Sequence, residues 1–595
     1  MNNLARRSSS TSHDVAQEVD SADFEKREAL ATDLDEEKVL GLDGAEYLEL
    51  KNTIARRTHS NNGTLPHSKS LRSLHSHRSY AGGDGYTCFS DNDERPNIPV
   101  DTAGDADGEF LVTWDGDCDP ENPRSMGMAR RWAIVLIVSA SSLCVTCTSS
   151  LYTSVYSQLI PEFHTSRLIC TLGLSLFVAG LGTGPMVLSP LSEFYGRRPV
   201  YIYSYSFFLI WLIPCAVARN TTTMLVSRFL DGLAGSAFLS VAGGTVGDMF
   251  AKHELSAPMM VYTASPFIGP EIGPLVGGFI VQNTSWRWCF YVLLIWSGVQ
   301  LALIVLFVPE TYHPVLLRNK ARWLRKETSN PRWIAPIEKL SRSITKTVLW
   351  SCIRPFQLLF WEPMCLNLCI LSAILLGILY LFFGAFPLVF QNNHGFTISQ
   401  VGLAFLGLFV GMLLGISSDP LWKMNYNRLV QQREVQGGEP GGTEPEFRLP
   451  PTIFGAFLVP IALFGKSLQE LTAGMLLTII PAGFGWTTYS HVHWIVPIIF
   501  STIFGIGIIW TYSGVFTFLV DCYPLYAASA LAANSFARSY FAAAFPLFGV
   551  QMYNNLGYQW ASTLLAFLAL VMAPFPILFY RYGKRLRGNS RFASA

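Results

Sequence analysis

The chain has 595 residues, of which 50% are hydrophobic, 14% are charged and 13% are aromatic, with a formal net charge of +1. A soluble globular domain carries about 25% charged residues, so this composition excludes both a soluble globular enzyme and a wholly disordered chain. The small net charge hides an asymmetry, because residues 1–131 hold 25 acidic and 15 basic side chains, whereas the remainder holds 17 and 28.

Residues 1–110 are predicted to form a disordered cytoplasmic tail. They are rich in Ser, Asp, Glu and Arg and contain no long apolar run, so they cannot bury enough surface to offset the entropy of the chain. The start is not predicted to be a signal peptide, because no apolar segment follows its basic residues. Basic residues flank hydroxyls at Ser8, Ser9, Thr58 and residues 68–79. A kinase is therefore a candidate partner of the tail, and an unregulated spacer is the alternative.

From residue 132 onward, apolar runs of about 20 residues recur, and each is long enough for a helix to cross a bilayer. The predicted spans are residues 132–152, 168–190, 200–218, 224–250, 257–281, 288–308, 364–390, 401–418, 451–465, 494–519, 525–550 and 560–580. A basic central loop at residues 309–363 divides them into two sets of six. We therefore expect one six-helix bundle at residues 111–308, a second at 364–587, and a short cytoplasmic tail at 588–595.

Lysine and arginine gather in alternate breaks between the spans, which by the positive-inside rule places both termini in the cytoplasm. These basic clusters are Arg197 with Arg198, and residues 318–326, 423–433 and 581–587. The glycosylation sequons at Asn220 and Asn283 fall on the opposite side, in agreement with this topology. Their loops are short and lie close to the membrane.

Residues 466–483 interrupt the pattern. If residues 471–489 formed a thirteenth span, the basic cluster at 581–587 would face outward, against the charge rule. We favour a retained intron, because residues 465–467 and 482–483 can be encoded by splice-donor and splice-acceptor sequences. A genuine extracellular or re-entrant insertion is the alternative.

Charged residues within spans are costly, so they usually line a cavity or pair with one another. Between the second and third spans, residues 184–199 read GPMVLSPLSEFYGRRP. This motif resembles the cytoplasmic loop signature of the major facilitator superfamily. The resemblance implies a gating cluster that favours the outward-facing state and breaks during alternating access. Its members would be Glu193, Gly196, Arg197, Arg198 and Asp248.

Within this cluster, we expect Glu193 to cap a helix N-terminus and Arg197 or Arg198 to pair with Asp248. Glu193 stands where the family usually has Asp, and Phe194 stands where a basic residue is common, which removes one charge contact. The alternative is that the two arginines only extend to the cytoplasmic surface of the membrane.

The fourth span carries Arg228 and Asp231 among small residues that let helices approach closely. Arg228 resembles the intramembrane arginine of the family, which is associated with proton coupling. Its guanidinium cannot be discharged, so it would act on the proton affinity of a nearby carboxyl, and Asp231 is the nearest candidate. A purely structural anchor is the alternative role.

The fifth span reads GPEIGPLVGG at residues 269–278. Its prolines and glycines are expected to kink the helix and open a groove along it. The pattern resembles the antiporter signature of the superfamily, which implies export in exchange for protons. The residues of this signature are Gly269, Pro270, Gly273, Pro274, Gly277 and Gly278, and Glu271 within it is the leading candidate for the proton site. A carboxyl satisfied by the backbone of the groove is the alternative.

Further segments resemble the fungal twelve-span drug:H⁺ antiporters, a group that includes polyamine and fluconazole exporters. They are residues 119–124, 286–288, 309–312, 320–328, 493–497 and 529–538. The resemblance covers residues 112–587 apart from the segment at 466–483. It implies an all-α membrane protein of the major facilitator fold, with two six-helix bundles related by a pseudo-two-fold axis.

For the substrate cavity, the expected residues are Tyr156, Tyr380, Trp510, Asn534 and Arg538. Aromatic side chains bind flat apolar or cationic compounds, although they also face lipid. The sequence shows neither a metal-ligand grouping among its 11 cysteines nor a phosphate-binding loop, so we expect no metal, cofactor, enzymatic activity, nucleic-acid partner or ATP-driven pump.

The predicted function is proton-coupled export of drugs, toxins or other small organic compounds at the plasma membrane, with the vacuolar membrane as the alternative location. Export of polyamines or of secondary metabolites fits the same motifs. A non-transporting transceptor or scaffold is the alternative of a different class.

Overall fold

The computed structural model describes residues 110–114, 119–250, 254–339, 344–437, 444–464, 492–588, 590 and 592–593. The predicted tail before Phe110 and the segment at residues 466–483 lie outside these ranges, so the predictions of a disordered tail and of a retained intron stay predictions.

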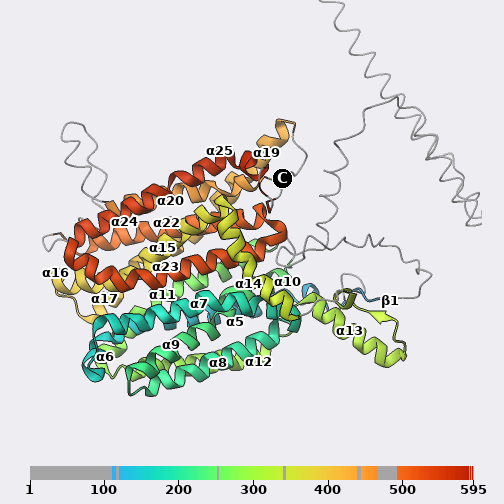
Figure 1. The fold of residues 1–595 in the computed structure, drawn as a ribbon, viewed down its shortest axis with the longest axis horizontal. Helices are drawn as coiled ribbons and strands as arrows, with labels where there is room; N and C mark the ends of the chain where they lie inside the picture. Colours follow the sequence, from blue (N-terminus) through green and yellow to red (C-terminus); the bar gives the residue numbers. More distant parts are fainter. Residues whose placement is uncertain are drawn as a thin grey trace, which may run out of the picture. The chain divides into compact units, whose positions relative to one another are not determined.

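One set of helices forms the N-terminal half of the membrane region (Figure 1). It consists of α5 (Met128–Leu151), α6 (Tyr156–Phe163), α7 (Arg167–Tyr195), α8 (Arg197–Val217), α9 (Thr221–Gly235), α10 (Ala237–Met249), α11 (Ser256–Asn283) and α12 (Arg287–Phe307). A 3₁₀ turn at Tyr152–Val155 joins α5 to α6 within one span. Side chains cap the N-termini of several helices. At the start of α9, for example, the Asn220 side chain accepts the backbone N–H of Thr223 at 2.8 Å.

A second set of helices forms the C-terminal half. It consists of α15 (Pro363–Phe386), α16 (Asn392–His394), α17 (Ile398–Ala404), α18 (Leu406–Ser417), α19 (Asp419–Val435), α20 (Pro450–Phe464), α22 (Ile495–Cys522), α23 (Ala527–Leu556), α24 (Tyr558–Met572) and α25 (Pro574–Gly588). A π-helical turn at Pro387–Gln391 continues α15 into α16. Thr397 and Gln400 form a reciprocal capping box that begins α17.

The segment between the halves contains two helices and a short strand, which pairs with another short strand before the first span. The helices are α13 (His313–Thr328) and α14 (Ile344–Trp361), and the parallel strands are β1 (Phe110–Leu111) and β2 (Trp333–Ile334). A salt bridge of 2.8 Å between Lys320 and Asp119 holds α13 to the segment before the first span.

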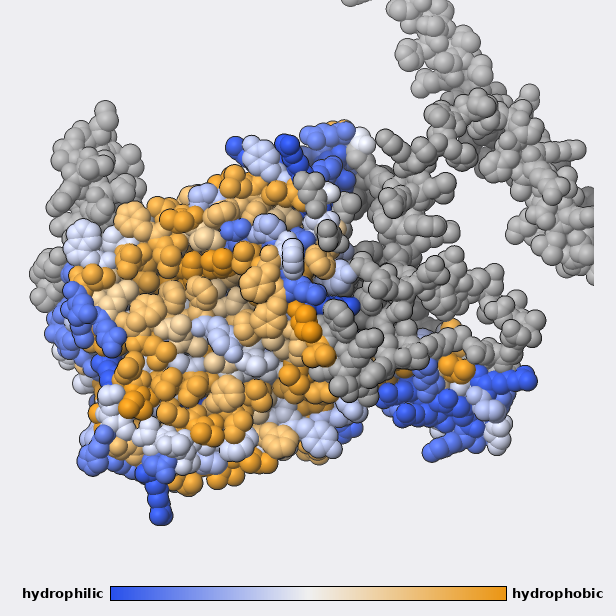
Figure 2. All heavy atoms as spheres, viewed as in Figure 1, coloured by the Kyte–Doolittle hydropathy of each residue, from blue (hydrophilic) through white to orange (hydrophobic). Residues whose placement is uncertain are grey.

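The helices present an apolar surface suited to lipid. Among the described residues, ten helices are long and apolar enough to cross a membrane, and α20 is a shorter apolar helix. Figure 2 shows apolar residues in a broad band over the helices, with polar residues gathered toward the helix ends. Each of the twelve predicted spans coincides with a described helix or helix pair, and the prediction of an all-α membrane fold is confirmed.

Glycines let the helices approach one another closely. Along α11, a Cβ on Gly269 or Gly273 would collide with the side chain of Thr146 or Ser150, and one on Gly277 would meet Ser154. The small residues of α11 therefore form the expected groove, and α5 fills it. The helix is continuous from Ser256 to Asn283 despite Pro266, Pro270 and Pro274 within it.

Candidate functional site

A group of charged and polar side chains lies buried within the membrane region. The exposed fraction is 0% for Arg228, Asp231 and Asn534, and 1% for Glu271. A buried charged or polar group lowers stability unless it is paired. These side chains are therefore candidates for functional residues.

Arg228 on α9 holds the end of α5. Its two terminal nitrogens donate to the carbonyl oxygens of Thr148 and Ser149 at 3.1 and 3.2 Å. The guanidinium also lies over the rings of Tyr152 and Phe177, 4.6 and 4.3 Å from their centroids. Those two carbonyls belong to the last turn of α5, next to the 3₁₀ turn that begins at Tyr152, so Arg228 supplies donors where the α-helix ends.

Asp231 lies one turn from Arg228 on the same helix. Its carboxylate oxygen is 4.0 Å from the nearest guanidinium nitrogen, and neither oxygen has a hydrogen-bond partner among the described residues. The pair brings together the two residues that the sequence predicted for proton coupling. The ionic contact is loose, because the guanidinium is committed to the carbonyls of α5.

Glu271 on α11 has no partner either. Both of its carboxyl oxygens are buried and lack a hydrogen-bond partner in the part of the chain that the structure describes. Its role as the proton site stays a prediction.

A hydrogen bond joins the two bundles beside these charges. The hydroxyls of Tyr380 on α15 and Ser149 on α5 are 3.0 Å apart. Ser149 uses its hydroxyl hydrogen to donate to the carbonyl of Thr146 at 2.6 Å, so Tyr380 is the donor in the bond between the bundles.

A small cavity lies next to Tyr380, and helices of both bundles line it. It leaves about 30 Å³ for the centres of water-sized molecules. Aliphatic residues of α7, α10 and α15 form much of its wall, together with Phe267 and Pro270 of α11. Its polar lining residues are Thr146, Tyr380, Arg538 and Ser539.

Of the residues predicted for the substrate cavity, Tyr380 and Arg538 line it, and three do not. The indole nitrogen of Trp510 donates to the hydroxyl of Ser418 at 2.7 Å, and its ring packs edge-on against Trp422. Tyr156 packs edge-on against Tyr152. Asn534 is fully buried on α23, one turn before Arg538. The sequence identified the aromatic residues but not the helix face on which each one lies.

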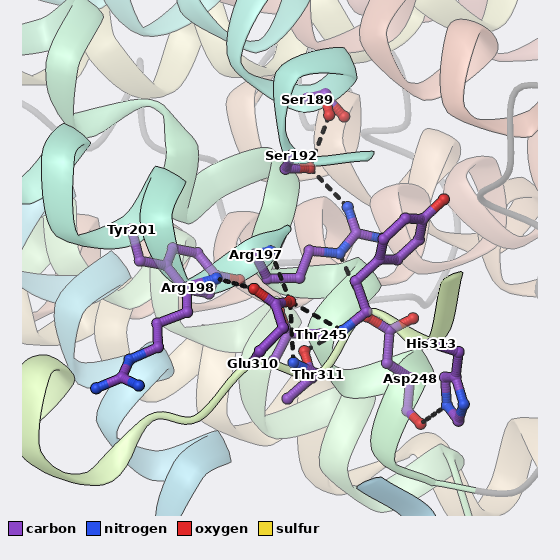
Figure 3. Close-up of polar contacts among 11 residues, drawn as sticks. Ser189, Ser192, Arg197, Arg198, Tyr201, Thr245, Asp248, Glu310, Thr311 and His313 are labelled. Carbon is purple, nitrogen blue, oxygen red and sulfur yellow. Dashed lines mark hydrogen bonds and ion pairs between the residues drawn. The ribbon is translucent and has the colours of Figure 1, made fainter. Parts of the chain in front are cut away.

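The cluster predicted for gating lies at the junction of α7 and α8 (Figure 3). The guanidinium of Arg197 is 3.3 Å from the carboxylate of Asp248 on α10 and donates to the hydroxyl of Ser192 at 2.7 Å. Its exposed fraction is 3%. Arg198 instead donates to the carbonyl of Val305 at 3.0 Å. Arg197 is therefore the arginine that pairs with the acidic residue, and it does so inside the protein.

The carboxylate that caps α8 belongs to Glu310, whereas the sequence had suggested Glu193 for a helix cap. Glu310 accepts the backbone N–H groups of Arg197 and Arg198 at 2.8 and 3.2 Å, and also that of Tyr312 at 3.0 Å. Glu193 lies in the last turn of α7. The order of acid, glycine and arginines in the sequence did not reveal a cap that comes from 113 residues further along the chain.

Gly196 provides both the backbone conformation and the space that the contact with Glu310 requires. Its φ of +102° lies in the region that glycine adopts without strain, and a Cβ there would collide with the Glu310 carboxylate. A second glycine, Gly244 on α10, leaves room for the guanidinium of Arg197.

The C-terminal half has a buried ion pair that sequence reasoning missed. Arg587 at the end of α25 forms two hydrogen bonds of 2.9 Å with the carboxylate of Glu446, and the side chains of both residues are 5% exposed. Nearby, Glu362 accepts from the hydroxyls of Tyr523 and Ser590 at 3.2 and 2.7 Å. From the sequence, the positive-inside rule alone accounted for the basic cluster at residues 581–587. The pairing of Arg587 with Glu446 was therefore not predicted.

The bundles also touch where α11 meets α17. A Cβ on Gly278 would lie 2.9 Å from the carbonyl oxygen of Ile398, and one on Gly402 would lie 2.6 Å from that of Pro274. The side chain of Gln282 accepts the backbone N–H of Ser399 at 3.0 Å. The backbones of the two bundles therefore pack directly against each other here.

Comparisons with known proteins agree on one family. The model of the Major Facilitator Superfamily matches residues 138–490. The chain is 55% identical over 487 residues to efflux pump atB of Aspergillus terreus, a match that covers 82% of this chain and 90% of the relative. It is 40% identical over 486 residues to the probable drug/proton antiporter YHK8 of Saccharomyces cerevisiae, covering 81% and 90%.

A solved structure has the same fold. The xylose transporter XylE from E. coli, in a partially occluded inward-open conformation, matches with a TM-score of 0.51 at 15% identity. The match covers 76% of this chain and 98% of that one.

Proposed function

The chain belongs to the major facilitator superfamily, and on that basis we propose that it is a proton-coupled antiporter that exports drugs, toxins or other small organic compounds. The names of its relatives, an efflux pump and a probable drug/proton antiporter, support export and proton coupling. In such transporters one bundle rocks against the other and exposes a central site to each side of the membrane in turn.

The observation that carries this proposal is the position of Glu271. Its carboxyl is buried without a hydrogen-bond partner among the described residues, on a helix in which Pro270 lines the cavity and Gly278 touches the other bundle. A carboxyl in these surroundings is stable while it is protonated, because an unpaired buried charge is costly. When the bundles move and water reaches it, the proton is released. Glu271 thus loads its proton on one side of the membrane and unloads it on the other.

Arg228 and Asp231 form the second part of the coupling device. Ionised Asp231 attracts the guanidinium, whereas protonated Asp231 leaves it to the carbonyls of Thr148 and Ser149. Because Ser149 also contacts Tyr380 of the other bundle, a change at Asp231 reaches the interface between the bundles through a single residue.

The contacts between α11 and α17 act as a gate at one end of the interface, and a polar cluster at the opposite end has a different role. The contacts of α11 with α17 must separate for the site to open on the side that we assign to the exterior. At the opposite end, Arg197, Asp248 and Glu310 hold the α7–α8 junction to α10 and to the segment after α12. We propose that this cluster keeps the N-terminal bundle rigid while it moves.

We place both termini in the cytoplasm and the protein in the plasma membrane. The basic clusters gather at one side of the membrane, and a plasma-membrane location lets efflux remove the compound from the cell. A kinase that modifies the N-terminal tail would act from the same side. Asn220 and Asn283 lie exposed at the ends of α9 and α11, and their glycosylation stays a prediction.

Inside-out membrane vesicles test the proposal. With an acidic interior, vesicles that contain the protein should accumulate a fluorescent drug or dye, and collapse of the pH gradient by a protonophore should abolish the accumulation. Vesicles from cells without the protein are the control. If no drug, dye or polyamine is taken up in response to the gradient, the chain is not an antiporter and a non-transporting scaffold takes its place.

A further inference from the structure

Arg538 is a half-buried cation for which the described structure provides no anion. It forms neither an ion pair nor a hydrogen bond with any described residue, and its Nε is buried without a partner. By contrast, Arg228 has Asp231 and Arg197 has Asp248.

Three aromatic rings hold the guanidinium in place. It lies 5.6, 5.8 and 5.2 Å from the ring centroids of Phe267, Tyr512 and Phe516. Aromatic faces stabilise a cation but leave its N–H groups unused. The position of the group is thus fixed while its hydrogen-bonding capacity remains available.

This capacity faces the cavity between the bundles. Arg538 is the only charged residue among those that line it, and the other polar lining groups are the hydroxyls of Thr146, Tyr380 and Ser539. The cavity therefore offers a cation and hydroxyls, with apolar walls around them. A cationic ligand would find no carboxylate in this lining and would be repelled by Arg538.

A second unused donor lies close by on the same helix. Asn534 precedes Arg538 by four residues, so the two lie on the same face of α23. Its side chain is fully buried, and neither its nitrogen nor its oxygen has a partner among the described residues. Buried polar atoms are almost always satisfied, so the unpaired atoms of Asn534 and Arg538 in adjacent turns require a partner that the described residues do not supply.

We infer that the exported compound is aromatic and presents a hydrogen-bond-accepting oxygen, as a carboxylate, phenolate or carbonyl, to Arg538. The ring packs against the apolar wall formed by Phe267 and Pro270, and the oxygen accepts from the guanidinium. The inference depends on the proposed function in one respect, namely that the bound compound is exported. It argues against polyamines, which would place ammonium groups beside an arginine.

Three naphthalene probes of similar size test this inference by titration of the purified full-length protein in lipid nanodiscs. They are 2-naphthoate, which is an anion, 2-acetylnaphthalene, which is a neutral acceptor, and 2-naphthylmethylammonium, which is a cation. We expect naphthoate and acetylnaphthalene to bind at least about tenfold more tightly than the ammonium compound, because charge-assisted hydrogen bonds are strong and like charges repel.

Variants at Arg538 locate the preference. Arg538→Gln should weaken naphthoate binding about tenfold or more and remove the discrimination against the ammonium compound, and Arg538→Lys should retain part of it. Arg448→Gln is the matched control, because Arg448 also stacks on a ring, at 4.1 Å from the centroid of Tyr426, but lies outside the cavity lining. Its probe profile should equal that of the unmodified protein.

Equal binding of the three probes, tighter binding of the ammonium compound, or an unchanged profile in Arg538→Gln would each overturn the inference. The comparison of the three probes on the unmodified protein tests the preference by itself. The inference can therefore be overturned even if a variant at Arg538 fails to fold. The proposed function is tested separately in inside-out vesicles. Gradient-driven uptake of the ammonium probe above that of vesicles without the protein, which trap amines passively in an acidic lumen, would support antiport while contradicting the inferred ligand.

Discussion

The Glu310 carboxylate accepts the backbone N–H of Arg197 at 2.8 Å, and through this contact the segment after α12 closes the N-terminus of α8. The first N–H groups of a helix lack partners within the helix and carry a partial positive charge, so a carboxylate there is stabilising. The side chain of the same Arg197 reaches Asp248 on α10. Two residues thus connect three parts of the N-terminal bundle.

Removal of this cap should lower stability. Glu310→Ala is expected to cost about 1 to 2 kcal/mol, because the first turn of α8 loses its acceptor. The measurement is the thermal unfolding midpoint of the purified protein in detergent. Glu327→Ala, at an exposed position on α13, is the control and should leave the midpoint unchanged. Equal midpoints for both variants would show that the cap contributes nothing.

The turn at Gly196 should not tolerate a side chain. Gly196→Ala combines a strained φ of +102° with a collision against Glu310, and we expect a loss of about 1 to 3 kcal/mol in stability. Gly127→Ala is the matched control, because nothing lies within 4 Å of a Cβ there. Unfolding curves of the two variants that coincide would contradict the geometry described at the α7–α8 junction.

The packing of α5 into α11 should be equally sensitive. In Gly273→Ala the new methyl group would meet the side chain of Ser150 and the backbone nitrogen of Leu151, so we expect a cost of about 1 to 3 kcal/mol and reduced transport. Gly298→Ala on α12 gains only an ordinary contact of 3.8 Å and serves as the control. Protein yield, unfolding midpoint and uptake rate report the difference. Normal uptake by Gly273→Ala would show that α5 and α11 need not pack this closely.

The hydrogen bond between Tyr380 and Ser149 should couple the bundles. Tyr380→Phe and Ser149→Ala each remove it, so the double variant should lose less transport than the sum of the two single losses, with a coupling energy of about 0.5 to 1.5 kcal/mol in a double-mutant cycle. Tyr553→Phe removes a comparable hydroxyl contact, with Ser562, inside one bundle and should not couple to Ser149→Ala. Additive effects of the Tyr380 and Ser149 substitutions would mean that the bond carries no coupling.

The helices of this protein were predictable because the thickness of a bilayer fixes the length of an apolar run. The buried charges were also found from sequence, since Arg228, Asp231 and Glu271 interrupt runs that are otherwise apolar. Gly269 and Gly273 predicted a groove without indicating that α5 would occupy it.

Long-range polar contacts were beyond the reach of sequence reasoning. Glu310 caps a helix that begins 113 residues earlier, and Arg587 pairs with Glu446 across 141 residues. No local pattern relates such partners, because the packing of whole helices brings them together. The same limit explains why the prediction of Trp510 as a cavity residue was wrong. Its residue type suits a cavity, but its position on the helix directs its side chain toward Ser418.

The central claim is that Glu271 carries the exchanged proton. The most direct test is uptake of a transported dye into proteoliposomes as a function of an imposed pH gradient, for the unmodified protein and for Glu271→Gln. Glutamine keeps the shape of the side chain and cannot release a proton. We predict that Glu271→Gln folds, exchanges dye across the membrane down its concentration gradient, and no longer accumulates it in response to the pH gradient. Accumulation by Glu271→Gln equal to that of the unmodified protein at every gradient would contradict the account.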